Sequence, residues 1–234
     1  MDILSQNTLF GIIISLITFE IGLLIYKKTK FPLFNPLLIA IILVISILLI
    51  FDIDIDTYNK GGEFINMFLG PATIVLAVPL YKQLQLLKKY LFPILIGILI
   101  GSSIGISSVI LLANIFGMEE IVTLSLLSKS VTTPIGIEIT NQLGGITPIT
   151  VLAIVISGIF GAVIGPVLFK IFKISNKVAI GISLGTASHA VGTTKALEFG
   201  ETEGAMSSLA IGITGIMTVF LAPVCYNLLS LILK

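Results

Sequence analysis

The sequence predicts an all-α polytopic membrane protein with about six full spans and two or three broken or re-entrant helices. Of its 234 residues, 56% are hydrophobic and 11% are charged. The mean hydropathy of +1.16 exceeds that of water-soluble domains. Apolar runs close to the ~20 residues of a transmembrane helix recur along the chain. They cover residues 8–26, 36–51, 91–113, 147–171 and 204–232. We therefore expect a multi-pass protein of the plasma membrane.

Three further apolar segments are shorter or interrupted, at residues 64–81, 118–142 and 178–198. The chain is expected to divide into N-terminal scaffold spans, residues 1–60, and a core, residues 61–234. Within the core, the interrupted helices are expected at residues 128–142 and 184–198.

Charged residues predict the orientation of the spans, because short cytoplasmic loops collect Lys and Arg. Lysines follow the first and third apolar segments, whereas acidic residues follow the second and fourth, which places the N-terminus outside. A full crossing by residues 118–142 would then leave Lys170, Lys173 and Lys177 outside. Either this segment enters and returns to the same side, or the charge bias fails once in this protein.

The stretch SKSVTTPIGIEITNQLGG, residues 128–145, explains why the segment would be interrupted. Pro134 lacks a backbone N–H and Gly136 loosens the next turn, while Thr132 and Thr133 can bond freed carbonyl groups. Carriers often build binding sites at such breaks in the middle of the membrane. The alternative is a simple packing kink between helices.

A second polar stretch, LGTASHAVGTTKALEFGETEG at residues 184–204, holds the single histidine of the chain. Sliding the sequence by 56 positions lays Gly136 on Gly192 and Ser130 on Thr186, and a long apolar span follows each copy. A unit of one broken segment plus one span makes one net crossing, so its copy must be inverted. The spacing therefore predicts an inverted repeat.

Three segments resemble signature segments of the LrgB family: residues 69–83, 129–139 and 184–212. This family includes CidB and the C-terminal half of the plastid glycolate/glycerate translocator. The resemblance implies one of two functions. One is an antiholin-like protein that acts with a small LrgA- or CidA-type membrane partner to influence murein hydrolase activity and lysis. The other is a carrier of small carboxylates such as pyruvate, glycolate, glycerate or lactate.

Ionisable residues within the apolar segments favour the carrier over a holin-like pore. Each such group costs at least ~2.5–3.5 kcal/mol at the bilayer centre, so several of them imply a shared hydrated site. His189 would bind a carboxylate or relay a coupling proton, or else only join two helices. Lys195 would bind the anion or snorkel to the surface. Glu138 would take a coupling H⁺ or Na⁺, or be merely solvated.

The predicted substrate site combines hydroxyl groups, backbone N–H groups and cations from both breaks. It comprises Thr132, Thr133, Pro134, Gly136, Gly185, Thr186, Ser188, His189, Gly192, Thr193, Thr194 and Lys195. The predicted coupling-ion residues are Glu138 and His189. Alternating access would come from movement of the repeats against the N-terminal spans, which are also the expected homodimer contact.

Other functional classes are disfavoured by composition. A net charge of +1 argues against nucleic-acid binding, and no glycine loop for phosphate is present. Cys225 has no partner for a disulfide or a zinc site, so no metal or cofactor is expected. The single histidine lacks an acid and a nucleophile at triad spacing, so an enzyme is not expected.

Overall fold

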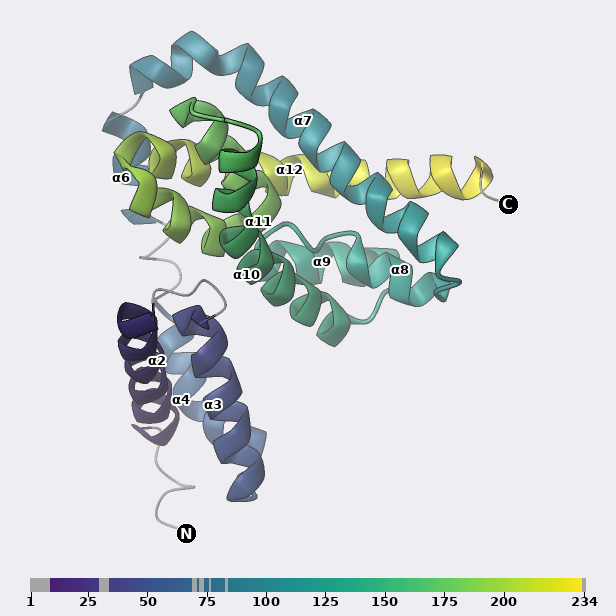
Figure 1. The fold of residues 1–234 in the computed structure, drawn as a ribbon. Helices are drawn as coiled ribbons and strands as arrows, with labels where there is room; N and C mark the ends of the chain where they lie inside the picture. The colour runs from purple at the N-terminus through teal and green to yellow at the C-terminus, as the bar shows by residue number, and fades with distance from the viewer. Residues whose placement is uncertain are drawn as a thin grey trace. The chain divides into compact units, whose positions relative to one another are not determined.

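The computed structural model describes residues 9–29, 34–68, 71, 74–75, 77–82 and 84–232. Every regular element in these ranges is a helix, which confirms the all-α prediction (Figure 1). The chain divides into two compact units, Met1–Val75 and Leu76–Lys234. The predicted division after residue 60 stays a prediction.

The described residues of the first unit include the helices α2 (Leu9–Thr29), α3 (Pro36–Ile50) and α4 (Ile55–Asn66). Asn35 caps α3, because its Oδ1 accepts hydrogen bonds from the backbone N–H groups of Leu37 and Leu38. Gly11 of α2 lies directly against the carbonyl oxygen of Tyr58 in α4, where a side chain would collide. Small residues therefore allow these apolar helices to approach closely.

Within the described ranges, four helices are long and apolar enough to cross a membrane, which supports the membrane prediction. They are Leu9–Thr29, Lys88–Ile115, Thr147–Ile171 and Glu201–Leu229. The span expected at residues 36–51 forms a shorter apolar helix, Pro36–Ile50, about 22 Å long. Part of the interrupted segment predicted at 64–81 lies outside the described residues, so its interruption stays a prediction.

The second unit contains α6 (Ala77–Lys82), α7 (Leu84–Ile115), α8 (Glu120–Leu126), α9 (Thr133–Leu143), α10 (Thr147–Ile171), α11 (Lys177–Phe199) and α12 (Glu201–Ile232). Helices α7 and α12 run in the same direction. Ile94 near the start of α7 shares a buried cluster with Met206, and Ile110 near its end shares one with Ala222. These two helices frame the elements that carry the site.

Helices α8 and α9 form a helical hairpin. The hydroxyl of Ser128, just beyond α8, lies 3.2 Å from that of Thr140 in α9. Ser125 in α8 accepts a hydrogen bond of 2.7 Å from the backbone N–H of Ile146, beyond the end of α9. The chain therefore turns at residues 127–132 and comes back alongside itself. That this segment enters and leaves the membrane on one side stays a prediction. The break precedes Pro134, which lies in the first turn of α9 and favours the start of this helix.

Helix α11 is a second hairpin, bent at Ser188 and His189, whose backbone angles are not helical. Gly192 lies against the carbonyl oxygen of Leu184, and Ala196 shares a buried cluster with Ile180. In a straight helix, the first pair would be ~12 Å apart and the second pair ~24 Å apart, because each residue adds about 1.5 Å. Neither pair would therefore meet. The two halves of α11 therefore run antiparallel.

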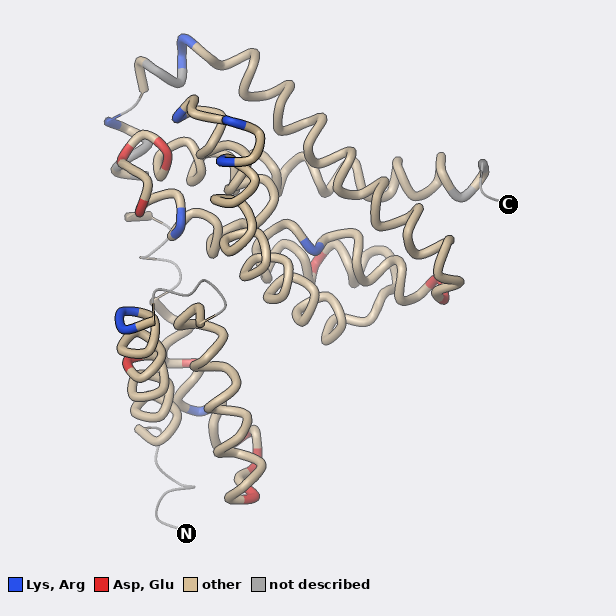
Figure 2. The backbone as a smooth tube through the Cα atoms, in the orientation of Figure 1, with Lys and Arg blue, Asp and Glu red and all other residues tan. Residues whose placement is uncertain are grey.

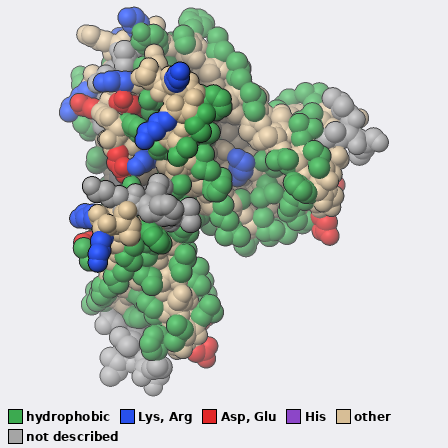
Figure 3. All heavy atoms as spheres, in the orientation of Figure 1, with side chains coloured by type: hydrophobic (Ala, Val, Ile, Leu, Met, Phe, Trp, Pro, Cys, Tyr) green, Lys and Arg blue, Asp and Glu red, His purple; other side chains and the backbone are tan. Residues whose placement is uncertain are grey.

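Most charged residues of the second unit lie toward its two ends (Figure 2), whereas Lys129 lies beside the middle of α10. Lys82 pairs with Glu201 at 3.2 Å, where α6 meets the start of α12. The end of α10 carries Lys170 and reaches the same end of the unit, since Phe169 packs on Phe199. At the opposite end, Tyr226 near the end of α12 donates a hydrogen bond of 2.6 Å to Glu120. Between the ends, apolar side chains cover much of the visible surface (Figure 3).

Candidate functional site

The tips of both hairpins contact the middle of α10. Ser157, near the centre of α10, donates a hydrogen bond of 2.6 Å to the carbonyl oxygen of Lys129 in the first tip. The Nε2 atom of His189, in the second tip, lies 2.9 Å from the carbonyl oxygen of Ile154, one turn earlier in α10. Because the hairpins start from opposite ends of the unit, their tips meet halfway along a helix that is long enough to span a membrane.

Two glycines of α10 make room for the second tip. A Cβ atom at Gly158 would lie 2.6 Å from ring atoms of His189. A Cβ atom at Gly161 would collide with the hydroxyl of Ser188. His189 itself has φ of 41° and ψ of −133°, a conformation that non-glycine residues rarely adopt. The tip is therefore a tightly packed, conformationally strained turn.

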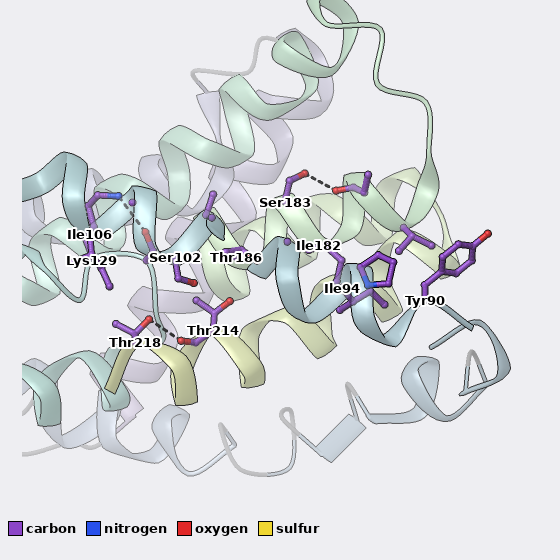
Figure 4. A pocket seen from close by; sticks show the side chains of 18 of the residues that line it. Tyr90, Ile94, Ser102, Ile106, Lys129, Ile182, Ser183, Thr186, Thr214 and Thr218 are labelled. Carbon is purple, nitrogen blue, oxygen red and sulfur yellow. Dashed lines mark hydrogen bonds between the residues drawn. The ribbon is translucent and has the colours of Figure 1, made fainter. Parts of the chain in front are cut away.

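A cavity of about 700 Å³ lies between α7, the first half of α11 and α12, beside both tips. It extends from Lys129 and Thr186, near the tips, to Tyr90 and Asn176 (Figure 4). Tyr90 and Asn176 lie toward the end of the unit that carries Lys82 and Lys170, which we call the lysine-rich end. Among the described residues that line it, Lys129 is the only charged one. The cavity therefore joins a single cation at mid-helix depth to one end of the unit.

Several hydroxyl groups line the same cavity as this cation. Lys129 donates a hydrogen bond of 3.1 Å to Ser130. Ser102 of α7, Thr186 of α11 and Thr214 of α12 line the same cavity, and their buried hydroxyl groups have no hydrogen-bond partner within the described part of the chain. Buried polar groups are nearly always paired, so this cluster is suited to a ligand with hydrogen-bond acceptors.

A second cavity of about 770 Å³ lies on the other side of α11, against α10. Its wall is mostly apolar and includes Phe160 and Ile156, whose side chains are largely exposed. Lys129 and Ala187 line both cavities. The first tip is therefore accessible from both sides of the first half of α11.

The predicted site residues lie in different parts of the structure, some in the two cavities and others in packing contacts between helices. Thr186 lines the first cavity and Ser188 the second. Glycines 136, 185 and 192 are packing residues, which lie against Ile154, Ser207 and Leu184 respectively. Thr193 also has a packing role, because its hydroxyl lies 2.7 Å from that of Ser207.

Other predicted residues lie outside the two cavities. Lys195 forms an ion pair of 2.6 Å with Glu198 on the returning half of α11. Thr194 donates a hydrogen bond to the carbonyl of Val191, one turn earlier. Glu138 is exposed on α9, where Gln142 donates a hydrogen bond of 3.2 Å to it. Thr132, Thr133 and Pro134 form the junction between the first tip and α9.

Sequence reasoning did not place Lys129, Ser102, Thr214 and Thr218 in the site. One of these residues, Lys129, carried a signal. Lys129 belongs to the same polar break as Thr132, and its neighbour Ser130 falls on Thr186 at the 56-residue spacing. Ser102 and Thr214 lie within long apolar helices, and only the folded arrangement brings them together.

The fold and the site define a helical membrane protein in which the tips of two hairpins contact the middle of α10, beside a cavity that holds one cation and several hydroxyl groups. The chain belongs to the LrgB-like family, whose match covers residues 15–228. It is 41% identical over 227 residues to the antiholin-like protein LrgB of Bacillus subtilis (strain 168), which covers 97% of this chain and 98% of that protein.

Other relatives carry the same name. The chain is 40% identical to the antiholin-like proteins LrgB of Bacillus cereus (strain B4264) and Bacillus anthracis (strain CDC 684 / NRRL 3495). Each alignment covers 92% of this chain and 94% of the relative. No solved structure matches the chain.

Proposed function

We propose that this chain is a secondary carrier of a small monocarboxylate of the pyruvate, glycolate, glycerate or lactate type. The observation that supports this function is the meeting of two hairpin tips at the middle of α10, beside a cavity that contains one cation. Non-helical backbone at membrane depth is stable only where protein or a watery cavity covers it. Broken segments around a midplane site are typical of carriers.

The order of elements also supports an inverted repeat. A hairpin followed by a long helix occurs twice, as α8–α9 with α10 and as α11 with α12. Contacts of α10 and α12 with the first half of α11 indicate that α10 and α12 run in opposite directions. Movement of these units against the first unit would give alternating access.

Orientation, coupling and assembly complete the proposal. The lysine-rich end of the second unit faces the cytoplasm and the N-terminus lies outside the plasma membrane. His189 and Glu138 are the candidates for coupling to H⁺ or Na⁺, and the first unit forms the contact of a homodimer.

The names of the relatives favour a second candidate function. These relatives are named antiholin-like protein LrgB. The family resemblance implies that such a protein acts with an LrgA-type membrane partner to control murein hydrolase activity and lysis. This function does not itself require a cavity that contains a cation and hydroxyl groups, whereas a carrier requires such a binding site. The two candidates therefore differ in whether the isolated chain transports a solute.

Uptake by proteoliposomes that contain only this chain tests the proposal. We expect saturable uptake of labelled pyruvate, glycolate or lactate that responds to a proton or sodium gradient. Leakage of solutes without saturation would contradict the carrier and favour a pore. Uptake or lytic control that appears only after addition of an LrgA-type protein would support the second function.

A further inference from the structure

We propose that Lys129 and the hydroxyl groups of Ser102, Thr186 and Thr214 bind the carboxylate group of a monoanionic substrate. This inference rests on the proposed carrier function and identifies its anion site. In this site the negative charge of the substrate pairs with Lys129 in the first hairpin tip, and not with His189 or Lys195. The site is built from four elements that are distant in the sequence.

The geometry of the cavity brings these four groups to one end. Figure 4 shows Lys129, Ser102, Thr186 and Thr214 at the inner end of the cavity, away from Tyr90. Gly101 of α7 lies next to Thr186, because a Cβ atom there would lie 3.4 Å from the Thr186 side chain, an ordinary van der Waals contact. Helix α7 therefore lies close to the second hairpin tip, at the depth where the first hairpin tip also lies.

The burial of these hydroxyl groups indicates that a bound ligand would supply their missing hydrogen-bond partners. Ser102, Thr186 and Thr214 are 7%, 8% and 1% exposed, and each hydroxyl is without a partner in the structure described above. Thr218, which lines the same cavity, is satisfied, because its hydroxyl donates to the carbonyl of Thr214. Ser188, which lines the second cavity, is also buried without a partner among the described residues. A carboxylate accepts several hydrogen bonds at once, so it would satisfy both the ammonium group and these hydroxyls.

The charge balance selects a monoanion. Lys129 is the only charged residue among the described residues that line the cavity. A second carboxylate on the ligand would have no cation to pair with in a poorly hydrated surrounding, which is unfavourable. The site is therefore expected to take lactate or pyruvate and to reject succinate.

The two other cations considered from the sequence are already engaged. His189 uses its Nε2 atom to bond Ile154, and its ring packs on Gly158. Lys195 pairs with Glu198 and lies outside both cavities. Lys129, by contrast, donates a hydrogen bond to Ser130 and has no carboxylate within 4.0 Å among the described side chains.

The test measures the half-saturation concentration for L-lactate in proteoliposomes. Lys129→Gln removes the cation and should raise it about tenfold or more, because charge-assisted hydrogen bonds contribute more than neutral ones. Thr214→Val keeps the shape but removes the hydroxyl, and should raise it about threefold to tenfold. Lys170→Gln, at the exposed end of α10, and Ser208→Ala, outside the cavity, are matched controls that should leave it unchanged.

Direct binding provides a second measurement. L-lactate should raise the melting temperature of the detergent-purified wild-type chain, whereas succinate at the same concentration should not. The shift should be lost in Lys129→Gln and reduced in Thr214→Val. If Lys129→Gln does not fold, Thr214→Val and Thr186→Val decide the result.

The outcomes separate the two proposals. Saturable wild-type uptake with unchanged half-saturation in Lys129→Gln and Thr214→Val would overturn this site but leave the carrier function intact. Equal binding of succinate and lactate would overturn the monoanion selectivity. Absence of saturable uptake and of any lactate shift in the wild type would overturn the carrier function itself.

Discussion

The imidazole of His189 donates a hydrogen bond from Nε2 to the carbonyl oxygen of Ile154 over 2.9 Å. A carbonyl oxygen only accepts, so Nε2 carries a hydrogen in both charge states of the ring. Protonation would therefore add a hydrogen at Nδ1 and leave this contact intact. The bond attaches the strained second tip to α10, which gives His189 a structural role that does not exclude a role in proton coupling.

Two substitutions of His189 separate these roles. His189→Ala removes a buried hydrogen bond and should lower stability by about 1–3 kcal/mol, seen as a lower melting temperature in detergent. His189→Gln can still donate to Ile154 but cannot titrate. If His189 carries the coupling proton, His189→Gln should fold and the pH dependence of uptake between about pH 5 and 8 should flatten. An unchanged pH profile would leave Glu138 as the coupling candidate.

The contact between α10 and the second tip predicts a strong effect of added volume. Gly161→Ala would place a methyl group against the Ser188 hydroxyl, so the tip must shift and uptake should fall severalfold. Gly212→Ala is the matched control. A Cβ atom there meets nothing within 4 Å, and alanine stabilises a helix by about 0.5–1 kcal/mol relative to glycine. Equal uptake by both variants would show that the tip tolerates displacement.

The positions of Pro134 and Gly192 predict unequal effects of alanine. The sequence suggests that both breaks depend on these residues. In the structure, Pro134 lies in the first turn of α9, where alanine is also accepted, so Pro134→Ala should retain most uptake. Gly192 lies against the Leu184 carbonyl, so Gly192→Ala should separate the halves of α11 and reduce uptake and melting temperature. Melting curves and uptake of the two variants provide the measurement.

The sequence predicts the helical membrane fold and the broken segments well, because composition and apolar run length depend on local residues. It locates the polar breaks at residues 128–142 and 184–198, and the structure has turns at residues 127–132 and at Ser188–His189. The repeat argument implies that both broken segments return to the side that they enter, but it does not locate the reversal of the second at His189. Backbone reversal at His189 depends on Gly158 and Gly161 of another helix, which no local pattern reveals.

The site is predicted only in part for the same reason. Thr186 stands out because it lies in a polar break, but Ser102 and Thr214 are isolated hydroxyl residues in apolar helices. Lys195 appears available in the sequence, whereas the folded chain pairs it with Glu198. Long-range packing therefore decides which polar residues reach the cavity.

The hairpin formed by α8 and α9 predicts the sidedness of two single cysteines. Met118 precedes the hairpin and Ile174 follows α10, so one net crossing separates them if the hairpin enters and returns. Two crossings would return Ile174 to the side of Met118. In a Cys225→Ser background, we expect Met118→Cys to react with an impermeant thiol reagent from outside intact cells, and Ile174→Cys to react only after permeabilisation. Lys28→Cys, after the first span, should behave like Ile174→Cys. Labelling of both Met118→Cys and Ile174→Cys from the same side would contradict the hairpin in the membrane and would require residues 118–142 to cross fully.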